Sequence, residues 1–160
     1  MDQYTFLTVM GNLAASVTVV TTFDGDARPT GLTVSAFSSV SLDPPLVLVC
    51  LAKDSSSLGA IRDRGGFTVN FLAAGTGDLA LMMASKSDDR FLGIPYDEPA
   101  TDVGGPILSE SVYAYFECRL ESEVDAGDHL VFLGQVEAGQ FLAERDPLVY
   151  WRRGFAEVTH

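Results

Sequence analysis

Hydrophobic and polar positions alternate along much of the chain, and this pattern predicts short strands. Residues 16–22, "SVTVVTT", are rich in β-branched side chains and predict a strand. Residues 30–37, "TGLTVSAF", predict a second one, and the Asp24-Gly25 turn between them suggests a hairpin. Residues 45–52, "PLVLVCLA", are continuously apolar, which predicts a strand buried on both faces. Residues 67–73, "FTVNFLA", predict a fourth strand.

The second half of the chain is dominated by a hairpin signature. Residues 112–142 form two long alternating segments joined at Asp125-Ala126-Gly127-Asp128, and residues 147–158 predict a final strand. Residues 93–108 are rich in Pro and Gly, which predicts a long surface connection. Short helices are expected at residues 2–13, at 53–65, where a serine caps the start and Gly65-Gly66 ends the helix, and at the start of 77–91.

The order of these elements predicts a mainly β fold. Helices do not alternate with strands, so an antiparallel barrel with Greek-key connections and a few short helices fits better than a βαβ sheet. The 160 residues contain no internal repeat, low-complexity segment or interdomain linker. We therefore expect a single domain over residues 1–160.

Composition narrows the possible locations and partners. Hydrophobic residues make up 47% of the chain, yet no apolar run approaches the roughly 18 residues needed to span a membrane. This excess must lie in a core, a subunit interface or a ligand cavity, and we expect a homodimer. The start, "MDQYTFLTVM", lacks the pattern of a signal peptide, so we expect a cytoplasmic protein.

The net charge and the cysteine spacing argue against further kinds of binding partner and site. A net charge of -12 argues against broad contact with nucleic acid or an anionic membrane, although local donors can still hold a small anion. Cys50 and Cys118 match no metal-binding spacing, and we expect two buried, reduced thiols. With two histidines in the chain, one of them C-terminal, no metal site is expected.

Two serine-rich stretches are candidates for ligand binding. In "TVSAFSSVS", Thr33 and Ser35 share one face of a strand, and Ser39 and Ser41 continue beyond it. These hydroxyls either satisfy a polar turn or face a planar polar ligand, and the pattern leaves both open. In "KDSSS", residues 53–57 either cap a helix or bind a phosphate at its N-terminus.

Two further stretches carry scarce charged groups. "SKSDDRF" places Arg90 beside Phe91, which suits either a solvated loop or contacts to a phosphate and a ring. "AGDH" places Asp128 beside His129, the one histidine away from the C-terminus. No serine or cysteine is plausibly paired with a base, so an enzyme of this sequence needs a bound cofactor to supply its reactivity.

These elements, in this order, resemble the flavin reductase-like family, whose fold is the FMN-binding split barrel. The strongest match is "PTGLTVSAFSSVSLDPPLVLVCL", flanked by "SVTVVTT", "FTVNFL", "DRF", "GGPIL", "ECRLESEVDAGDHLVFLGQV" and "PLVYWRRGF". Each stretch alone is weakly specific, but their collinear order covers nearly the whole chain.

The resemblance implies a homodimeric antiparallel barrel that binds FMN or FAD and takes electrons from NADH or NADPH. We expect NADH, because no basic cluster awaits a 2′-phosphate. Many members are small reductases that release reduced flavin to a separate monooxygenase, which is the expected partner. Two alternatives stay open. The first is a flavoprotein of the same fold, either an oxidase or a flavin carrier, that does not use NAD(P)H. The second is a non-catalytic barrel that binds small molecules.

The resemblance also implies roles for individual residues. The residues expected along the flavin ring are Thr33, Val34 and Ser35, continued by Ser39, Val40 and Ser41. The residues expected at the phosphate are Lys53, Ser55, Ser56 and Ser57. Asn70 is expected at the ribityl chain or ring edge, Arg90 and Phe91 are expected to close over the flavin, and His129 is expected near the nicotinamide. The chain departs from the family pattern where Asn12 replaces a usual Arg and Ala15-Ser16 replaces a usual Thr-Gly. These changes are expected to alter flavin packing or to favour exchangeable binding.

Overall fold

The structure is a computed structural model that describes residues 1–158, which form ten strands and three short helices. The elements are α1 (Gln3–Gly11), β1 (Ala15–Ser16), β2 (Thr18–Phe23), β3 (Pro29–Val34), β4 (Phe37–Leu42), β5 (Pro45–Ala52), α2 (Leu58–Arg64), β6 (Gly66–Leu72), α3 (Gly77–Ala84), β7 (Val112–Ala126), β8 (His129–Phe141), β9 (Val149–Trp151) and β10 (Gly154–Ala156). The predicted fold class and the 112–142 hairpin are confirmed.

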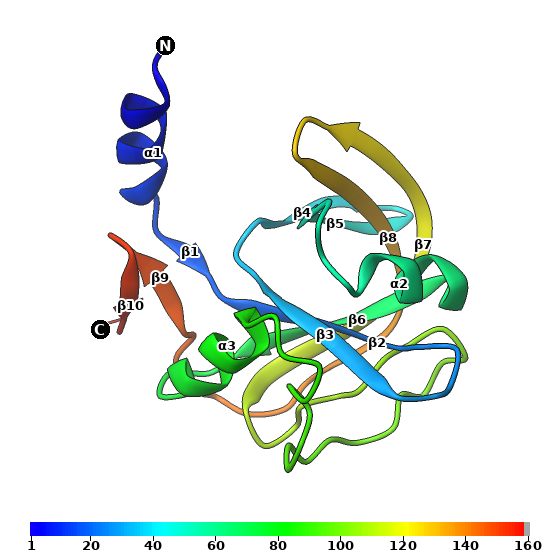
Figure 1. The fold of residues 1–160 in the computed structure, drawn as a ribbon. Coiled ribbons are helices and arrows are strands. Elements are labelled where there is room, and N and C mark those ends of the chain that lie inside the picture. Colours follow the sequence, from blue (N-terminus) through cyan, green and yellow to red (C-terminus); the bar gives the residue numbers. More distant parts are fainter. Residues whose placement is uncertain (159–160) are drawn as a thin grey trace.

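Seven strands form one antiparallel sheet in the order β3-β2-β6-β7-β8-β5-β4. Within it, β5 lies beside β8 while β6, β7 and β8 follow one another, which is a Greek-key arrangement. The sheet curls into a barrel (Figure 1), and the backbone N–H of Cys50 on β5 donates to the carbonyl of Ala36, just beyond β3. The helices α2 and α3 lie over the strands, whereas α1 stands apart from the barrel (Figure 1).

The barrel is filled by alternate residues of its strands. Buried side chains of β2, β5, β6 and β8, among them Val20, Val49, Phe67 and Phe132, form the main cluster. A second cluster beneath α3 includes Met83 and residues of β1–β2, β6 and the later loops. Burial of this apolar surface is the principal stabilising contribution to the fold.

Strand β5 differs from its prediction. Val47, Val49 and Leu51 are buried, whereas Leu48 and Cys50 on the opposite face are only half-buried. The prediction of burial on both faces is therefore wrong for this chain, because inward positions alternate with positions on an open outer face.

Two predicted irregular segments are more ordered than expected. Residues 37–42, whose serines the pattern left open between a polar turn and contacts with a planar ligand, form the edge strand β4 with a register shift between Ser39 and Ser41. The connection 93–108 was predicted to lie on the surface, but residues 103–108 are buried. Its backbone crosses β2 so closely that a Cβ on Gly105 would lie 2.3 Å from the carbonyl oxygen of Thr21. Glycine is required there, since any side chain would displace the connection.

The C-terminal segment was predicted as one strand and is instead a short hairpin, β9–β10. Arg152 and Arg153 form its turn with positive φ values of 51° and 63°. The hairpin pairs with β1 and holds the end of α1: Trp151 Nε1 donates to the carbonyl oxygen of Asn12, and Arg152 Nε donates to Asn12 Oδ1, both at 3.1 Å. Asn12, which departs from the family pattern, thus anchors α1 to β9–β10. No helix within residues 1–158 is long and apolar enough to cross a membrane.

Candidate functional site

The outer face of β5, together with the end of β3, forms the floor of a groove. Every second residue of β5, namely Leu48, Cys50 and Ala52, lies on this face. On the neighbouring segment, Thr33 of β3 and Ser35, which follows the strand, also share one face. From Leu48 to Ala52 the strand advances about 13 Å at roughly 3.3 Å per residue. Two cavities lie along this direction, and a third continues from the second.

The first cavity, the apolar cleft, has a volume of about 680 Å3. The end of α1, β1, the β3–β4 connection, β5 and the β9–β10 hairpin surround it, and Leu48, Cys50 and Tyr150 are among its lining residues. Ser16 also lines the cleft, and its Oγ is buried without a hydrogen-bond partner among the described residues. A buried hydroxyl without a partner is unusual and suits a ligand that hydrogen-bonds there.

The second cavity, the middle lobe, has a volume of about 420 Å3 and lies where β3 and β5 meet the loop after α3. Its polar lining residues are Thr33, Asp54, Ser55, Ser56, Ser85, Lys86, Asp88 and Arg90. Arg90 is only 9% exposed. Its Nη2 donates to Ser56 Oγ at 2.9 Å and its Nη1 to the Ser85 carbonyl oxygen at 3.2 Å.

The charge of Arg90 is the main electrostatic feature of the middle lobe. No ion pair links its guanidinium to a carboxylate within residues 1–158, whereas Lys86 pairs with Asp54 at 3.1 Å. A buried guanidinium is costly unless an anion compensates it, and its fork of donors matches a phosphate. The Arg90 guanidinium is therefore suited to an anionic ligand, while the Asp88 carboxylate also lines the lobe.

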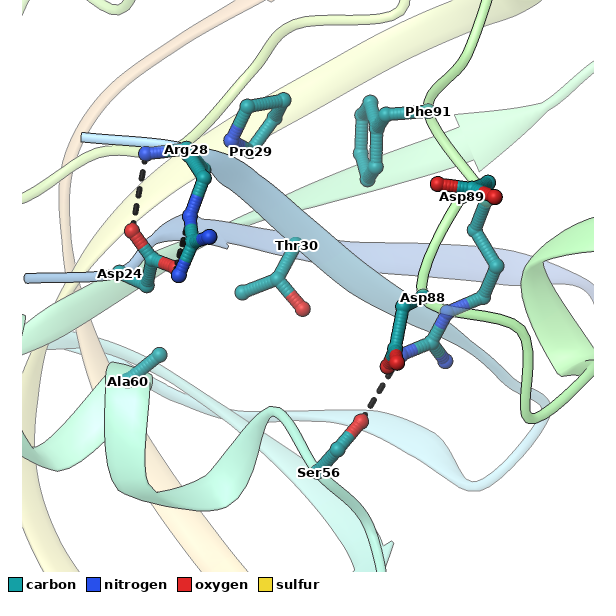
Figure 2. Close-up of a pocket in the computed structure, with 10 residues that line it drawn as sticks. Asp24, Arg28, Pro29, Thr30, Ser56, Ala60, Asp88, Asp89 and Phe91 are labelled. Atoms are coloured by element: carbon teal, nitrogen blue, oxygen red, sulfur yellow. Dashed lines mark hydrogen bonds and ion pairs between the residues drawn. The ribbon is translucent and has the colours of Figure 1, made fainter. Parts of the chain in front are cut away.

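The third cavity, the outer lobe, has a volume of about 510 Å3 and shares Ser56, Asp88 and Arg90 with the middle lobe. Figure 2 shows Pro29 and Phe91 on one side of it and Ala60 on the opposite side. The carboxylate of Asp24 accepts the backbone N–H of Arg28, which lowers the pKa of Asp24 and keeps it ionised near neutral pH. The middle and outer lobes are thus continuous, and the apolar cleft lies next to the middle lobe along β3 and β5.

The structure brings together six of the residues predicted from the resemblance. Ser35 lines the apolar cleft, and the other five lie in or between the middle and outer lobes: Thr33, Ser55, Ser56, Arg90 and Phe91. The Thr33 hydroxyl is already used, since it donates to the carbonyl oxygen of Ala80 at 2.5 Å. Their contacts with flavin stay a prediction.

Three residues with predicted flavin contacts have side chains that are buried in the protein, and those contacts stay predictions. Asn70 is fully buried: its amide nitrogen donates to Thr21 Oγ1 and the Pro106 carbonyl, and its oxygen accepts the Leu108 N–H. Ser57 is also fully buried, and its Oγ is hydrogen-bonded to Thr30 Oγ1 at 2.9 Å.

The Val34 side chain packs in the main core cluster, and its carbonyl oxygen accepts the Thr18 hydroxyl. The Val34 side chain therefore faces the barrel interior, and the predicted place of Val34 along the flavin ring stays a prediction. The polar neighbours of Asn70, Ser57 and Val34 are satisfied inside the protein, which the strand pattern alone does not reveal.

Lys53 points away from the middle lobe, and its predicted contact with the phosphate stays a prediction. Its side chain forms an exposed ion pair with Asp125 on β7, at 2.6 Å, and it does not line the middle lobe. The reason is alternation: Ala52 points into the groove, so the next residue along the chain points away from it. Ser39, Val40 and Ser41 lie on the edge strand β4, outside the three cavities. Their predicted contact with the flavin ring stays a prediction.

His129 begins β8 directly opposite Ala52 of β5. Directly opposed residues on neighbouring strands share a face, so His129 lies on the groove side at the border of the middle lobe. Its Nδ1 is 2.6 Å from Asp128 Oδ1, and this hydrogen bond lowers the pKa of Asp128. The prediction that His129 contacts nicotinamide remains a prediction, with its position beside the groove now defined.

The structure adds residues that the sequence interpretation did not assign. Leu48, Cys50 and Ala52 line the groove, and Asp88 borders its two polar lobes. Ser16, which the sequence associated with flavin packing without assigning it a contact, lines the apolar cleft. The period of two along residues 48–52 could have indicated a shared face. The partnerless hydroxyl of Ser16 could not be predicted, because it depends on the packing of α1 and β9.

Comparison with known proteins identifies the family. Residues 10–159 match the domain described as "Flavin reductase like domain". The chain belongs to the flavin reductase-like family. It is 46% identical to a flavin reductase (NADH) from Kitasatospora aureofaciens, over 98% of this chain and 82% of the relative. It is 40% identical to the reductase subunit HsaB of a flavin-dependent monooxygenase from Rhodococcus jostii, over 99% of this chain and 79% of the relative.

Solved structures of family members share the split-barrel fold. An NADH:FAD oxidoreductase from Streptomyces globisporus, solved with NAD and FAD fragments, superimposes with a TM-score of 0.90 at 30% identity, covering 99% of this chain and 93% of that one. The flavin reductase component of a bacterial two-component tryptophan halogenase has a TM-score of 0.86 at 34% identity, covering 99% of each chain. The predicted family and fold are confirmed.

The groove fits a flavin on its own chemistry. The apolar cleft offers half-buried Leu48 and Cys50 to a planar ring and the unpaired hydroxyl of Ser16 to its polar edge. The middle lobe offers the guanidinium of Arg90 and the hydroxyls of Ser55 and Ser56 to a phosphate. The roughly 13 Å between Leu48 and Ala52 is comparable with the length of a ring carrying a ribityl phosphate.

The two cysteines provide a test of the apolar cleft. Burial, together with the nearby charge of Glu117, raises the pKa of Cys118 to about 12, so its thiol stays protonated and unreactive near neutral pH. Cys50 is half-buried and lines the cleft. We expect iodoacetamide to label Cys50 at least about 10-fold faster than Cys118, as measured by peptide mass spectrometry.

Saturating flavin is expected to slow the labelling of Cys50 and to leave that of Cys118 unchanged. Equal labelling of Cys50 with and without flavin would place the flavin ring elsewhere. The Cys50→Ser variant is the control that identifies the labelled site.

Proposed function

We propose that this protein is an NADH-dependent flavin reductase that supplies reduced flavin to a separate monooxygenase. The observation that carries the proposal is the groove itself, in which an apolar cleft lies beside a buried guanidinium that has no carboxylate partner among residues 1–158. The names of its relatives support the same activity: one is a flavin reductase (NADH) and another is a reductase subunit of a monooxygenase.

A flavin bound in this groove would accept hydride from NADH, and the chain's own residues bind and orient the two molecules. Arg90, Ser55 and Ser56 would hold the phosphate, and Leu48 and Cys50 would exclude water from one face of the ring. Alignment of two reactants in a dry site is the principal contribution a protein makes to such a transfer. The described residues around the groove show no paired nucleophile and base, which agrees with a reaction that needs neither.

We propose that the working form is a homodimer. The helix α1 has no buried residue, and Tyr4, Phe6, Leu7, Val9 and Met10 are all exposed. A nine-residue helix is too short to be stable without packing, so this apolar surface needs a partner. A second copy would cover α1 and the apolar cleft beside it. A sedimentation mass equal to one chain at micromolar concentration would refute this.

The expected partner and location follow from the reaction. Free reduced flavin can diffuse to an oxygenase, so no stable complex between the two enzymes is required. NADH belongs to the cytoplasm, which we propose as the location. The net charge of -12 makes nucleic acid an unsuitable partner.

The direct test is NADH oxidation, followed at 340 nm while FAD or FMN is titrated into the purified protein. Saturable turnover with free flavin supports a reductase that treats flavin as a substrate. Flavin binding without NADH or NADPH turnover would leave a flavoprotein of the same fold, an oxidase or a flavin carrier. Failure to bind either flavin at high micromolar concentration would favour a non-catalytic barrel.

His129→Ala is expected to raise the NADH KM more than it lowers kcat. His129 lies opposite Ala52 beside the groove, so we expect its side chain to position the nicotinamide. A role in acid–base catalysis is not expected, because hydride transfer needs no prior proton removal. Steady-state kinetics with varied NADH measures both constants. A fall in kcat of about 10²-fold at constant KM would instead identify a group that acts in the transition state. Asp128→Asn, which keeps a side-chain oxygen beside Nδ1, is the matched control.

A further inference from the structure

The turn between β9 and β10 holds two arginines in a backbone conformation that suits neither of them. Arg152 and Arg153 are the two loop residues of this hairpin, and their φ values are 51° and 63°. Two-residue hairpin loops of this kind favour Asn and Gly, because most other side chains are sterically disfavoured at positive φ. Residues that break such a local rule are often found at functional sites, so each arginine needs an explanation.

The contacts of Arg152 explain its presence, whereas those of Arg153 do not. Arg152 Nε donates to Asn12 Oδ1, and its guanidinium lies 4.2 Å from the centroid of the Trp151 ring. Arg152 therefore helps to hold α1 on the hairpin. The side chain of Arg153 forms no hydrogen bond or ion pair with another residue of the range 1–158, and it lines the apolar cleft.

Arg153 gives the apolar cleft a positive charge that no carboxylate compensates. It is the one charged side chain among the described residues that line the cleft, and the others are apolar or neutral. Arg153 is exposed and also lines a smaller cavity of about 330 Å3 beside α1, so it lies at the edge of the cleft. In a chain with a net charge of -12, a free cation beside an apolar cleft is a local site for a negative charge.

Ser16 is a second and independent indication that a polar ligand atom enters this cleft. Its Oγ is buried and has no hydrogen-bond partner among the described residues. Ser16 lies on β1, which pairs with β9, so Ser16 and Arg153 belong to the same three-stranded sheet. A buried hydroxyl without a partner and a free guanidinium in one cleft together suit a ring with a polar, negatively charged edge.

We propose that Arg153 stabilises the negative charge that hydride transfer places on the flavin ring. This inference rests on the proposed flavin reductase function and deepens it. Hydride leaves C4 of NADH with both electrons of its C–H bond and bonds to N5 of the ring. The products are NAD⁺ and a flavin with one additional negative charge. A fixed cation where this charge develops favours reduced over oxidised flavin.

The first test compares the binding of oxidised FMN and photochemically reduced FMN by anaerobic calorimetry on the complete protein. Arg153→Gln is expected to weaken binding of reduced FMN about 5-fold, because an exposed charge is partly screened. Binding of oxidised FMN should change less than about twofold. Tenfold corresponds to about 30 mV for two electrons, so the midpoint potential of bound FMN falls by about 20 mV. Arg145→Gln removes an exposed arginine outside the cleft and should change neither affinity.

The second test uses the stability of the flavin-free protein. Arg153→Gly and Arg153→Asn are expected to raise Tm by about 2–4 °C, because both residues tolerate a positive φ. Both should weaken binding of reduced FMN as Arg153→Gln does. Ala27→Gly relieves the same kind of strain in the β2–β3 turn, where φ is 57°, and should raise Tm without changing either FMN affinity. An arginine kept for structural reasons would lower Tm when it is replaced.

Unchanged or equally weakened binding of the two FMN forms in Arg153→Gln would overturn the proposal, as would a lower Tm in both Arg153→Gly and Arg153→Asn. Dissociation of a homodimer by Arg153→Gln would also overturn it, because a second copy would then supply the anion. If the unmodified protein oxidises NADH but Arg153→Gln keeps the ratio of the two affinities, only this inference fails. If NADH is not oxidised but the ratio changes as expected, only the proposed function fails. A protein that binds neither form overturns both.

Discussion

Replacing Arg90 with alanine is expected to weaken flavin binding by about 30-fold or more. Removal of one member of a buried, hydrogen-bonded charge pair costs roughly 2–5 kcal/mol, and 2 kcal/mol corresponds to about 30-fold in affinity. Arg90 is 9% exposed, and its described hydrogen-bond partners are neutral oxygens, so a bound phosphate would be its counter-ion. Flavin fluorescence or calorimetry measures the loss.

Two further variants make the Arg90 result specific. Arg90→Lys keeps the charge but loses the forked donors, so an intermediate loss is expected. Arg62→Ala removes an exposed arginine whose partner is Glu123, far along the chain on β7, and flavin affinity should not change. If Arg90→Ala binds FMN and FAD as tightly as the unmodified protein does, the phosphate is not on this guanidinium.

Asn70→Ala is expected to lower the free energy of unfolding by about 3 kcal/mol. The substitution leaves the buried Leu108 N–H without a partner, which costs about 1–3 kcal/mol, and removes the bonds of Asn70 to Thr21 Oγ1 and the Pro106 carbonyl, which stay hydrogen-bonded to each other. For a chain of this length, such a loss lowers Tm by about 6–12 °C. Thermal or urea unfolding, followed by circular dichroism, measures it.

The matched control for Asn70 is Gln140→Ala, which removes an exposed amide from β8 and should change stability by about 0.5 kcal/mol or less. The two roles considered for Asn70 also differ in a second measurement. Asn70→Ala that is still folded at low temperature should bind FMN within about threefold of the unmodified protein, because its amide contacts protein atoms. A large loss of FMN affinity with little loss of stability would restore the role predicted from the sequence.

The local pattern of the sequence predicts much of this fold. The β-branched run before Asp24, the hairpin signal at residues 125–128 and the glycine after α2 each act through neighbouring residues, so they can be interpreted without tertiary structure. The resemblance to a family predicted that the protein binds a flavin and that Arg90, Phe91 and the serines lie near it. The structure brings Ser35, Ser56, Arg90 and Phe91 into one groove.

Tertiary structure alone decided which polar side chains are free to bind a ligand. Asn70 and Ser57 have polar side chains of the kind that bind ligands. However, Asn70 is hydrogen-bonded to Pro106 and Leu108 in the connection 93–108, and Ser57 is hydrogen-bonded to Thr30. Lys53 pairs with Asp125, which lies on a strand distant in sequence. Whether a polar group is available depends on which distant residues reach it, and a linear pattern does not contain that information.

The sequence by itself therefore determined the family, the strand order along the chain and the need for a bound cofactor. The tertiary structure decided that the open face of β5 is the floor of a groove, that Arg90 is buried without a carboxylate partner among the described residues, and that an outer lobe lies beyond it. The reason is physical: strand and turn propensities act between neighbours, whereas burial and charge compensation are set by contacts between distant segments.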